Sequence, residues 1–421
     1  MGRAEGRVLM GALQAPGVIE WMVGVPDQVF LSDVHEQKPL IHGGGDVDRF
    51  DALLTLDRLN DRLAEMDLRE GMVEMTNARS PVDRSDYVAN GVVDRVALAR
   101  GYRNGATLVV NQLQHSDKRL ADFCRALEQA LSCHIQTNIY LTPPGEQGFR
   151  THYDSHDVFV LQVEGEKTWR LYDEPAASPY RGEKFRSGEH AAGEASHSFV
   201  LRKGDCAYIP RGYFHDAANL GDGPSLHITV GLIVRTWADL MLEAVSEVCL
   251  QDRAFRKALP YDYARPDFDP ARLQPVFDAL VERLSGAIAP ANAWETISEA
   301  FIRSREPDIA DAIARNRADD GTIYVARPAF TRISDLGDGV RVLGPGSDFR
   351  FGRAPVGLVR RILSGEPFRL ADLDHPEAAD VVERLTTAGL VHRQAGERAA
   401  PWGPGRAPGP PADRRAGGAN D

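Results

Sequence analysis

Two histidines and an aspartate stand at spacings that would suit a metal ion. His152 and Asp154 lie two residues apart in "RTHYDSHDVFV", ahead of an apolar run that is typical of a strand. Residues i and i+2 of a β-strand point to the same face, so both side chains could reach one ion. His215, further along the chain, is a candidate for the third ligand.

The segment around His215 explains how it would reach the other two. "GDCAYIPRGYFHDAAN" fits the pattern G-x5-P-x-G-x2-H-x3-N, the second motif of the cupin superfamily, at Gly204, Pro210, Gly212, His215 and Asn219. The pattern predicts a turn, a short strand, and a Pro-Arg-Gly turn that delivers His215 into a barrel beside His152 and Asp154. Two imidazoles and one carboxylate leave three octahedral positions open, as in the facial triad of non-haem Fe(II) oxygenases.

Each histidine by itself could equally be a buried, hydrogen-bonded barrel residue. The order of the two motifs favours convergent metal ligands. A second H-x-D pair, His115 and Asp117, stands where a strand gives way to a helix. Ser116 or Asp117 is a natural N-cap there, and a helix start does not hold i and i+2 on one face, so we do not expect a metal at this pair.

The elements around these motifs predict a mixed α+β chain. Short β-branched runs broken by Gly, Pro and Asp are typical of a barrel or a sandwich. The cupin motif favours the barrel, a double-stranded β-helix, and the family resemblance described below implies its cupin/Jumonji-C form. A helical region follows, with Thr236 and Asp239 placed as a capping box. The expected divisions are an uncertain N-terminal segment (1–25), the barrel (26–235), a helical connector (236–320), a winged-helix-like domain (321–393) and a disordered Pro/Gly-rich tail (394–421).

The composition narrows the class of protein. The 421 residues carry a net charge of -12, which disfavours binding to nucleic acid or to an anionic membrane surface. There is no run of about 18 apolar residues. The four cysteines form no C-x-x-C pair, which fits a reducing compartment. We therefore expect a cytoplasmic protein.

The motifs together resemble the Jumonji-C ribosomal oxygenases of the cupin fold. The likeness is close over "QTNIYLTPPGEQGFRTHYDSHDVFVLQVEGEKTWRLYD", "KGDCAYIPRGYFHDA" and "SLHITVG". It implies an enzyme that uses Fe(II), 2-oxoglutarate and O2 to hydroxylate an arginyl or histidyl side chain of a ribosomal protein, with decarboxylation of 2-oxoglutarate to succinate and CO2. It also implies His152, Asp154 and His215 as the iron ligands, and a homodimer formed through the helical connector.

The resemblance further implies residues that hold 2-oxoglutarate. Lys167 falls where the family places a basic residue that pairs with the distal carboxylate, although "EGEK" also reads as a turn with a solvated lysine. Asn138 and Tyr140 share one strand face, and His227 and Thr229 share another. These four are candidate contacts of the co-substrate. The alternatives are core packing for Tyr140 and a place behind the direct contacts for His227 and Thr229.

Other functions remain open on the sequence. The same iron chemistry could act on a small molecule or a peptide natural product, or on an N-methyl-lysine as a demethylase. A non-catalytic cupin that senses a ligand, with DNA bound by the winged-helix-like domain, is a further alternative. Arg360 and Arg361 would serve it, but the acidic net charge makes a solvated face the better interpretation. No residue identifies the substrate.

Overall fold

The computed structural model describes residues 17–172, 178–180, 182–183, 185–186, 188, 192–310, 312–313, 321–352 and 354–394. These residues fall into two compact units, 17–234 and 235–394. Residues 1–16 of the uncertain N-terminal segment and residues 395–421 of the expected tail lie outside the described part. No helix within it is long and apolar enough to cross a membrane.

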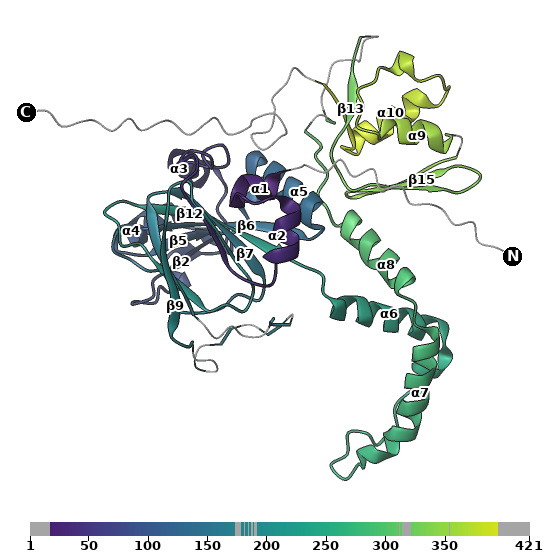
Figure 1. Ribbon diagram of the computed structural model, residues 1–421, viewed down its shortest axis with the longest axis horizontal. Coiled ribbons are helices and arrows are strands. Elements are labelled where there is room, and N and C mark those ends of the chain that lie inside the picture. The colour runs from purple at the N-terminus through teal and green to yellow at the C-terminus, as the bar shows by residue number, and fades with distance from the viewer. Residues whose placement is uncertain are drawn as a thin grey trace, which may run out of the picture. The chain divides into compact units, whose positions relative to one another are not determined.

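The first unit contains helices and antiparallel sheets (Figure 1). Its helices are α1 (Val18–Val23), α2 (Asp27–Asp33), α3 (Leu56–Glu65), α4 (Arg95–Arg103) and α5 (Lys118–Leu131). Its strands are β1 (Leu40–His42), β2 (Val73–Thr76), β3 (Val88–Ala89), β4 (Val92–Val93), β5 (Thr107–Val110), β6 (His134–Thr142), β7 (Asp157–Glu164), β8 (Glu166–Tyr172), β9 (Ala195–Arg202), β10 (Cys206–Ile209), β11 (His215–Ala218) and β12 (Ser225–Ile233).

Two sheets form the barrel that the sequence predicted. A seven-stranded sheet has the order β1-β10-β7-β12-β6-β5-β2, and a three-stranded sheet has the order β11-β8-β9. Successive side chains along each strand point to opposite faces of the sheet. One face of the large sheet buries Ile139, Phe159 and Ile228 in a core shared with α1 and α5, whereas Val158 and Val160 on its other face pack with the small sheet.

The second unit begins with helices and ends in a small α/β module. The helices are α6 (Trp237–Gln251), α7 (Gln274–Ala287) and α8 (Pro290–Arg303). The module contains β13 (Tyr324–Ala326), β14 (Arg332–Asp335), β15 (Val340–Gly344), β16 (Ser347–Phe351), α9 (Val356–Ile362), α10 (Ala378–Thr387) and β17 (Val391–Arg393). The capping box at the start of α6 is confirmed, with the Thr236 hydroxyl accepting from the Asp239 amide.

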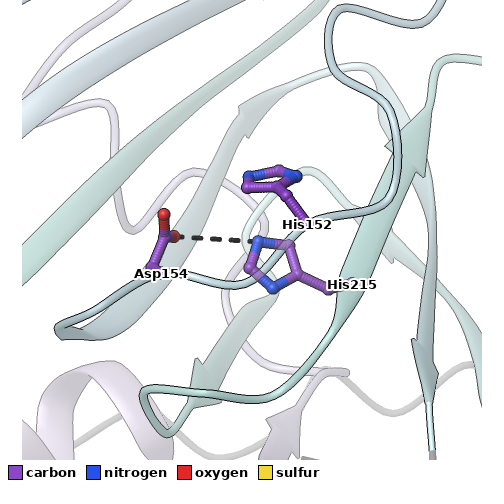
Figure 2. Close-up of side chains that lie close together, drawn as sticks. All are labelled: His152, Asp154 and His215. Carbon is purple, nitrogen blue, oxygen red and sulfur yellow. Dashed lines mark ion pairs between the residues drawn. The ribbon is translucent and has the colours of Figure 1, made fainter. Parts of the chain in front are cut away.

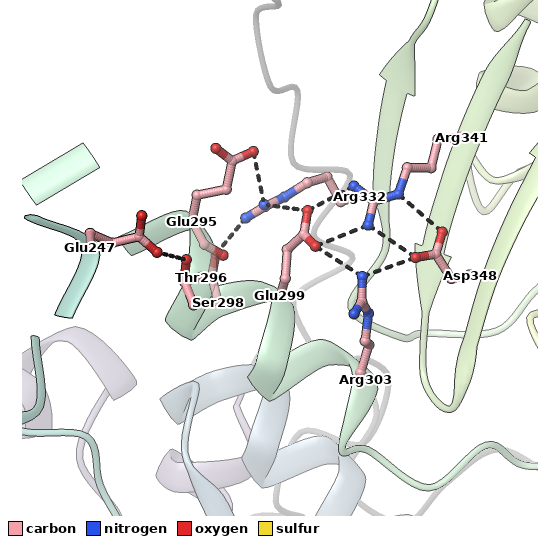
Figure 3. A network of polar contacts seen from close by, with 9 residues as sticks. All are labelled: Glu247, Glu295, Thr296, Ser298, Glu299, Arg303, Arg332, Arg341 and Asp348. Atoms are coloured by element: carbon pink, nitrogen blue, oxygen red, sulfur yellow. Dashed lines mark hydrogen bonds and ion pairs between the residues drawn. The ribbon is translucent and has the colours of Figure 1, made fainter. Parts of the chain in front are cut away.

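A network of charged side chains joins α8 to the sheet β14-β15-β16 (Figure 3). Arg341 donates to both carboxylate oxygens of Glu299 at 2.9 Å and to those of Asp348 at 3.0 Å. Arg303 bridges the same two carboxylates, and Arg332 pairs with Glu299 at 3.4 Å. Because bidentate guanidinium–carboxylate pairs are directional as well as strong, this network fixes α8 against the sheet.

Substituting Glu299→Gln is expected to loosen this junction. The change leaves Arg341 and Arg303 with half their anionic partners, so the local stability should fall by about 1–2 kcal/mol, or roughly 5- to 30-fold. Hydrogen exchange of α8 and β15 peptides measures this, with β6 peptides as an internal reference. Asp380→Asn, which removes an exposed pair with Arg384, is the control and should change exchange little. Unchanged exchange in α8 would contradict the prediction.

Candidate metal and co-substrate site

His152 and Asp154 lie in an irregular segment, and the expectation that they share a strand is wrong. No regular element covers residues 143–156, and β7 begins only at Asp157. His152 makes an isolated antiparallel bridge to His215 at the start of β11, with backbone bonds of 3.0 and 2.7 Å in the two directions. The apolar run that suggested a strand therefore starts after the pair, and long-range pairing with His215 sets its position.

The structure brings the three candidate ligands together (Figure 2). One ligand atom from each of His152, Asp154 and His215 lies within 4.8 Å of the others. His215 Nε2 is 3.7 Å from Asp154 Oδ2, too long for a hydrogen bond, and the imidazole centroids are 4.5 Å apart. His215 is delivered as the motif predicted, by β10, the turn at Pro210 and β11.

The hydrogen bonds of the two imidazoles engage Nδ1 of each ring and leave Nε2 available for a metal. His152 Nδ1 lies 2.8 Å from the Arg150 carbonyl, and His215 Nδ1 lies 3.0 Å from the Tyr213 carbonyl. A carbonyl only accepts, so Nδ1 carries the proton and Nε2 keeps its lone pair. Burial and the neighbouring His152 lower the pKa of His215 to about 4, which also favours the neutral, ligating form.

In a second cluster of side chains that could bind a metal, an arginine already pairs with both carboxylates. His35, Glu36 and Asp157 also lie within 4.8 Å of one another. Arg211 pairs with Glu36 at 2.6 Å and with the fully buried Asp157 at 2.9 Å. Because a guanidinium already sits between the carboxylates, a metal cation would be repelled there, and His152, Asp154 and His215 form the better site.

Lys167 is buried and has no anionic partner within the part of the chain that the structure describes. Its side chain lies on β8, and the residue is 4% exposed, so the alternative of a solvated turn lysine is wrong. Nζ donates to Thr142 Oγ1 at 2.9 Å, its one hydrogen-bond partner in the described residues. Burial lowers the pKa of Lys167 to about 7. A buried amine with one bond is incomplete, and a carboxylate ligand would satisfy the ammonium.

The other predicted contacts stand opposite one another on adjacent strands. In the pairing of β6 with β12, Tyr140 faces His227 and Asn138 faces Thr229. The Tyr140 and His227 rings stack at 4.8 Å, and a register shift in β12 falls just before His227. Asn138 Oδ1 accepts from the Gln112 amide at 3.0 Å. The four side chains thus share the sheet face that carries Thr142.

Two buried polar atoms beside Lys167 have no hydrogen-bond partner among the residues with described positions. They are His227 Nδ1 and Trp169 Nε1, and the Trp169 ring lies 5.8 Å from His227 and 5.9 Å from His215. Burial, and next the Lys167 charge, hold the pKa of His227 well below its usual range. Unpaired buried groups are costly, so these atoms fit a site for a polar ligand between Lys167 and the triad.

Sequence reasoning missed two residues of this surface. Thr142 accepts a hydrogen bond from Lys167. Gln162, fully buried on β7, donates from its side-chain amide to Ser225 Oγ at 2.9 Å, while its Oε1 has no partner in the described parts of the chain. Alternation gave a signal for Thr142, since it shares a strand face with Asn138 and Tyr140. No signal identified Gln162, because its strand is an almost continuous apolar run.

Comparisons with known proteins agree with this geometry. Residues 108–240 match the sequence profile of the JmjC domain. The bifunctional lysine-specific demethylase and histidyl-hydroxylase NO66 of Dictyostelium discoideum is 38% identical over 174 residues, which are 39% of this chain and 33% of that protein. Ribosomal oxygenase 1 of Danio rerio is 30% identical over 260 residues, 59% of this chain and 47% of that protein. The chain thus spans a third to a half of these curated relatives.

Among solved structures, YcfD of Escherichia coli has a similar fold. The TM-score is 0.52 at 16% identity, covering 89% of this chain and 99% of that one. YcfD, described as a ribosomal oxygenase, has also been solved with cobalt and 2-oxoglutarate, and that structure matches with a TM-score of 0.50 at 15% identity, covering 89% of this chain and 99% of that one. Together with the JmjC match over residues 108–240, this likeness confirms a chain of mixed helices and strands with a cupin-like JmjC domain.

Proposed function

We propose that this chain, which carries a JmjC domain of the kind found in ribosomal oxygenases, is an Fe(II)- and 2-oxoglutarate-dependent oxygenase that hydroxylates a protein side chain. The observation that carries the proposal is the triad of His152, Asp154 and His215 on the same barrel interior as the buried Lys167, which pairs with no carboxylate among the described residues. The proposed substrate is an arginine or histidine of a ribosomal protein, as the family resemblance implies. The relatives' names, ribosomal oxygenase and histidyl-hydroxylase, support the ribosomal protein and the histidine.

Each residue has a defined task in this proposal. His152, Asp154 and His215 hold iron, which supplies the activation of O2 that no side chain can perform. Lys167, with Thr142, binds the distal carboxylate of 2-oxoglutarate. Asn138, Tyr140, His227 and Thr229 orient the co-substrate from the facing strands. One oxygen atom of O2 enters succinate as CO2 leaves, and the other becomes the hydroxyl of the product.

A specific observation also favours a demethylase as the second candidate. The curated relatives named NO66 carry both lysine-specific demethylase and histidyl-hydroxylase in their names. The same residues would serve both activities, since hydroxylation of an N-methyl group gives a product that loses formaldehyde. Formaldehyde release therefore separates the two.

The test is an anaerobic preparation reconstituted with Fe(II) and 2-oxoglutarate and then exposed to air with ribosomal-protein peptides. We expect succinate formation that rises with one peptide, which gains the mass of one oxygen atom. Formaldehyde with a methyl-lysine peptide would favour the demethylase. Succinate without any peptide response would direct the search to small molecules, and an absence of turnover would contradict the oxygenase.

The second unit supports two finer parts of the proposal. Exposed apolar side chains lie on α6 and α7, among them Trp237, Met241, Val276 and Phe277. We propose that this helical region forms a homodimer, which the molar mass from light scattering would test. Residues 321–393 are proposed as the winged-helix-like domain, because they contain α9, the short 3-10 helix Leu370–Asp372, α10 and β17 in this order. We also propose a location in the cytoplasm, because the four cysteines form no C-x-x-C pair and fit a reducing compartment.

A further inference from the structure

A buried carboxylate stands directly behind the metal triad. Asp216 follows His215 on β11, and its side chain points to the opposite face, where the residue is 3% exposed. Thr151 Oγ1 donates to its Oδ2 at 2.8 Å, and the Tyr172 hydroxyl donates to the same oxygen. Arg170 Nε donates to Oδ1 at 2.9 Å. Asp216 thus gathers three donors, and one of them directly precedes His152.

This arrangement compensates for the missing strand around His152. The segment 150–154 carries two of the three candidate ligands without a regular ladder to hold it. It is joined to β11 by the backbone pair between His152 and His215, and to the turn before β11 by the bond from the Gly212 amide to the Asp154 carbonyl at 2.9 Å. The Thr151–Asp216 bond at 2.8 Å is a side-chain contact that adds to these three backbone bonds, as does the bond from Arg150 Nε to the Ala78 carbonyl at 2.9 Å.

We infer that Asp216 is a positioning residue for the metal site. By holding Thr151, it fixes the segment that presents His152 and Asp154 against the strand that presents His215. Tyr172 and Arg170, both on β8, hold the Asp216 carboxylate in turn. The inference rests on the proposed function, because it assumes that the triad binds a metal. Outer partners of this kind commonly change metal affinity by about 10- to 100-fold.

The test is a titration of the full chain, freed of metal, with cobalt(II) chloride, followed by visible absorption. Thr151→Val keeps the shape of the side chain and removes its donor, so we expect a Kd for Co(II) about 10-fold weaker and altered cobalt bands, whereas Thr151→Ser should restore both. Asp216→Asn should weaken binding by about 10- to 100-fold. In the Asp216→Asn chain, adding Thr151→Val should weaken cobalt binding little further, because both changes disturb the same Thr151–Asp216 bond.

Controls separate positioning from a general loss of structure. Glu166→Gln removes an exposed carboxylate of the same sheet and should leave the Kd unchanged. Thr151→Val should unfold at the wild-type temperature without metal. If the wild-type chain binds cobalt and the Thr151→Val and Asp216→Asn chains bind it equally well, the positioning role is refuted while the metal site stands. If the wild-type chain binds none, the metal site fails and the inference with it.

Discussion

Replacing His215 with alanine is expected to abolish cobalt(II) binding and to lower 2-oxoglutarate turnover by about 10³-fold or more. His215 Nε2 is one of three ligand atoms that lie within 4.8 Å of one another, and no other side chain of the described residues completes that group. Losing one of three protein ligands removes several kcal/mol of metal-dependent stabilisation, which corresponds to a rate change of this order. Cobalt titration and succinate formation measure the two effects.

The matched control is a histidine on the same small sheet. His197 on β9 is exposed, and its Nδ1 lies 2.8 Å from Ser196 Oγ, so His197→Ala should bind cobalt and turn over like the wild type. The backbone bonds that join residues 215 and 152 do not depend on the imidazole, so the His215→Ala chain should keep its circular dichroism. Wild-type cobalt affinity in this folded variant would exclude His215 as a ligand.

The position of His215 could be predicted because the motif around it is local backbone chemistry. Gly204 and Gly212 have φ of +86° and +83°, values that favour glycine. A Cβ on Gly204 would lie 2.7 Å from the Asp46 carbonyl oxygen, so no other residue fits this turn without a shift of the backbone. Such requirements are visible in the sequence, because each depends on the residue type at one position.

The arrangement of His152 and Asp154 could not be read in the same way. Periodicity extended the β7 strand backward over both residues, whereas the structure holds them through the bridge to His215 and the contact of Thr151 with Asp216. These contacts join positions far apart in the chain. The hydrophobic pattern of a sequence does not report such contacts. The identities of the ligands could therefore be proposed from the sequence, while the local structure predicted for them was wrong.

Lys167 shows that a turn motif can mislead. The turn in "EGEK" is made at Gly165, with φ of +64°, and β8 has already begun when the chain reaches Lys167. Lys167, Trp169 and Leu171 alternate and are all buried, so they share the inner face of the small sheet. The partner of Lys167, Thr142, lies on the other sheet, and one sequence does not reveal that contact.

Lys167→Met is expected to weaken 2-oxoglutarate binding by about 100-fold or more while leaving cobalt binding unchanged. Methionine keeps much of the length and apolar stem but cannot pair with a carboxylate, and breaking a buried charge pair typically costs about 2–5 kcal/mol. Calorimetric titration of the cobalt-loaded protein with 2-oxoglutarate measures the affinity. Lys118→Met, which removes an exposed amine paired with Asp122 on α5, is the control. An unchanged affinity in Lys167→Met would remove Lys167 from the site.

The lowered pKa of Lys167 leads to a prediction of how 2-oxoglutarate binding depends on pH. Without the ligand, burial lowers the pKa of Lys167 to about 7, and its close neighbours are the neutral His227 and the Thr142 hydroxyl. A carboxylate ligand favours the ammonium and so raises this pKa, which means that binding takes up a proton above pH 7. The affinity should therefore be constant below about pH 7 and fall by up to about tenfold per unit above it.

Two variants make this pH dependence specific to Lys167. The decrease of affinity with rising pH should vanish in Lys167→Met, because methionine has no amine that can bind a proton. It should also vanish in Lys167→Arg, because a guanidinium stays charged throughout this range, although the larger group would lower the affinity at every pH. A wild-type affinity for 2-oxoglutarate that stays constant from pH 6 to 9 would mean that the Lys167 amine is already protonated over this range before the ligand binds. A slope that persists in Lys167→Met would assign the titration to another group of the site.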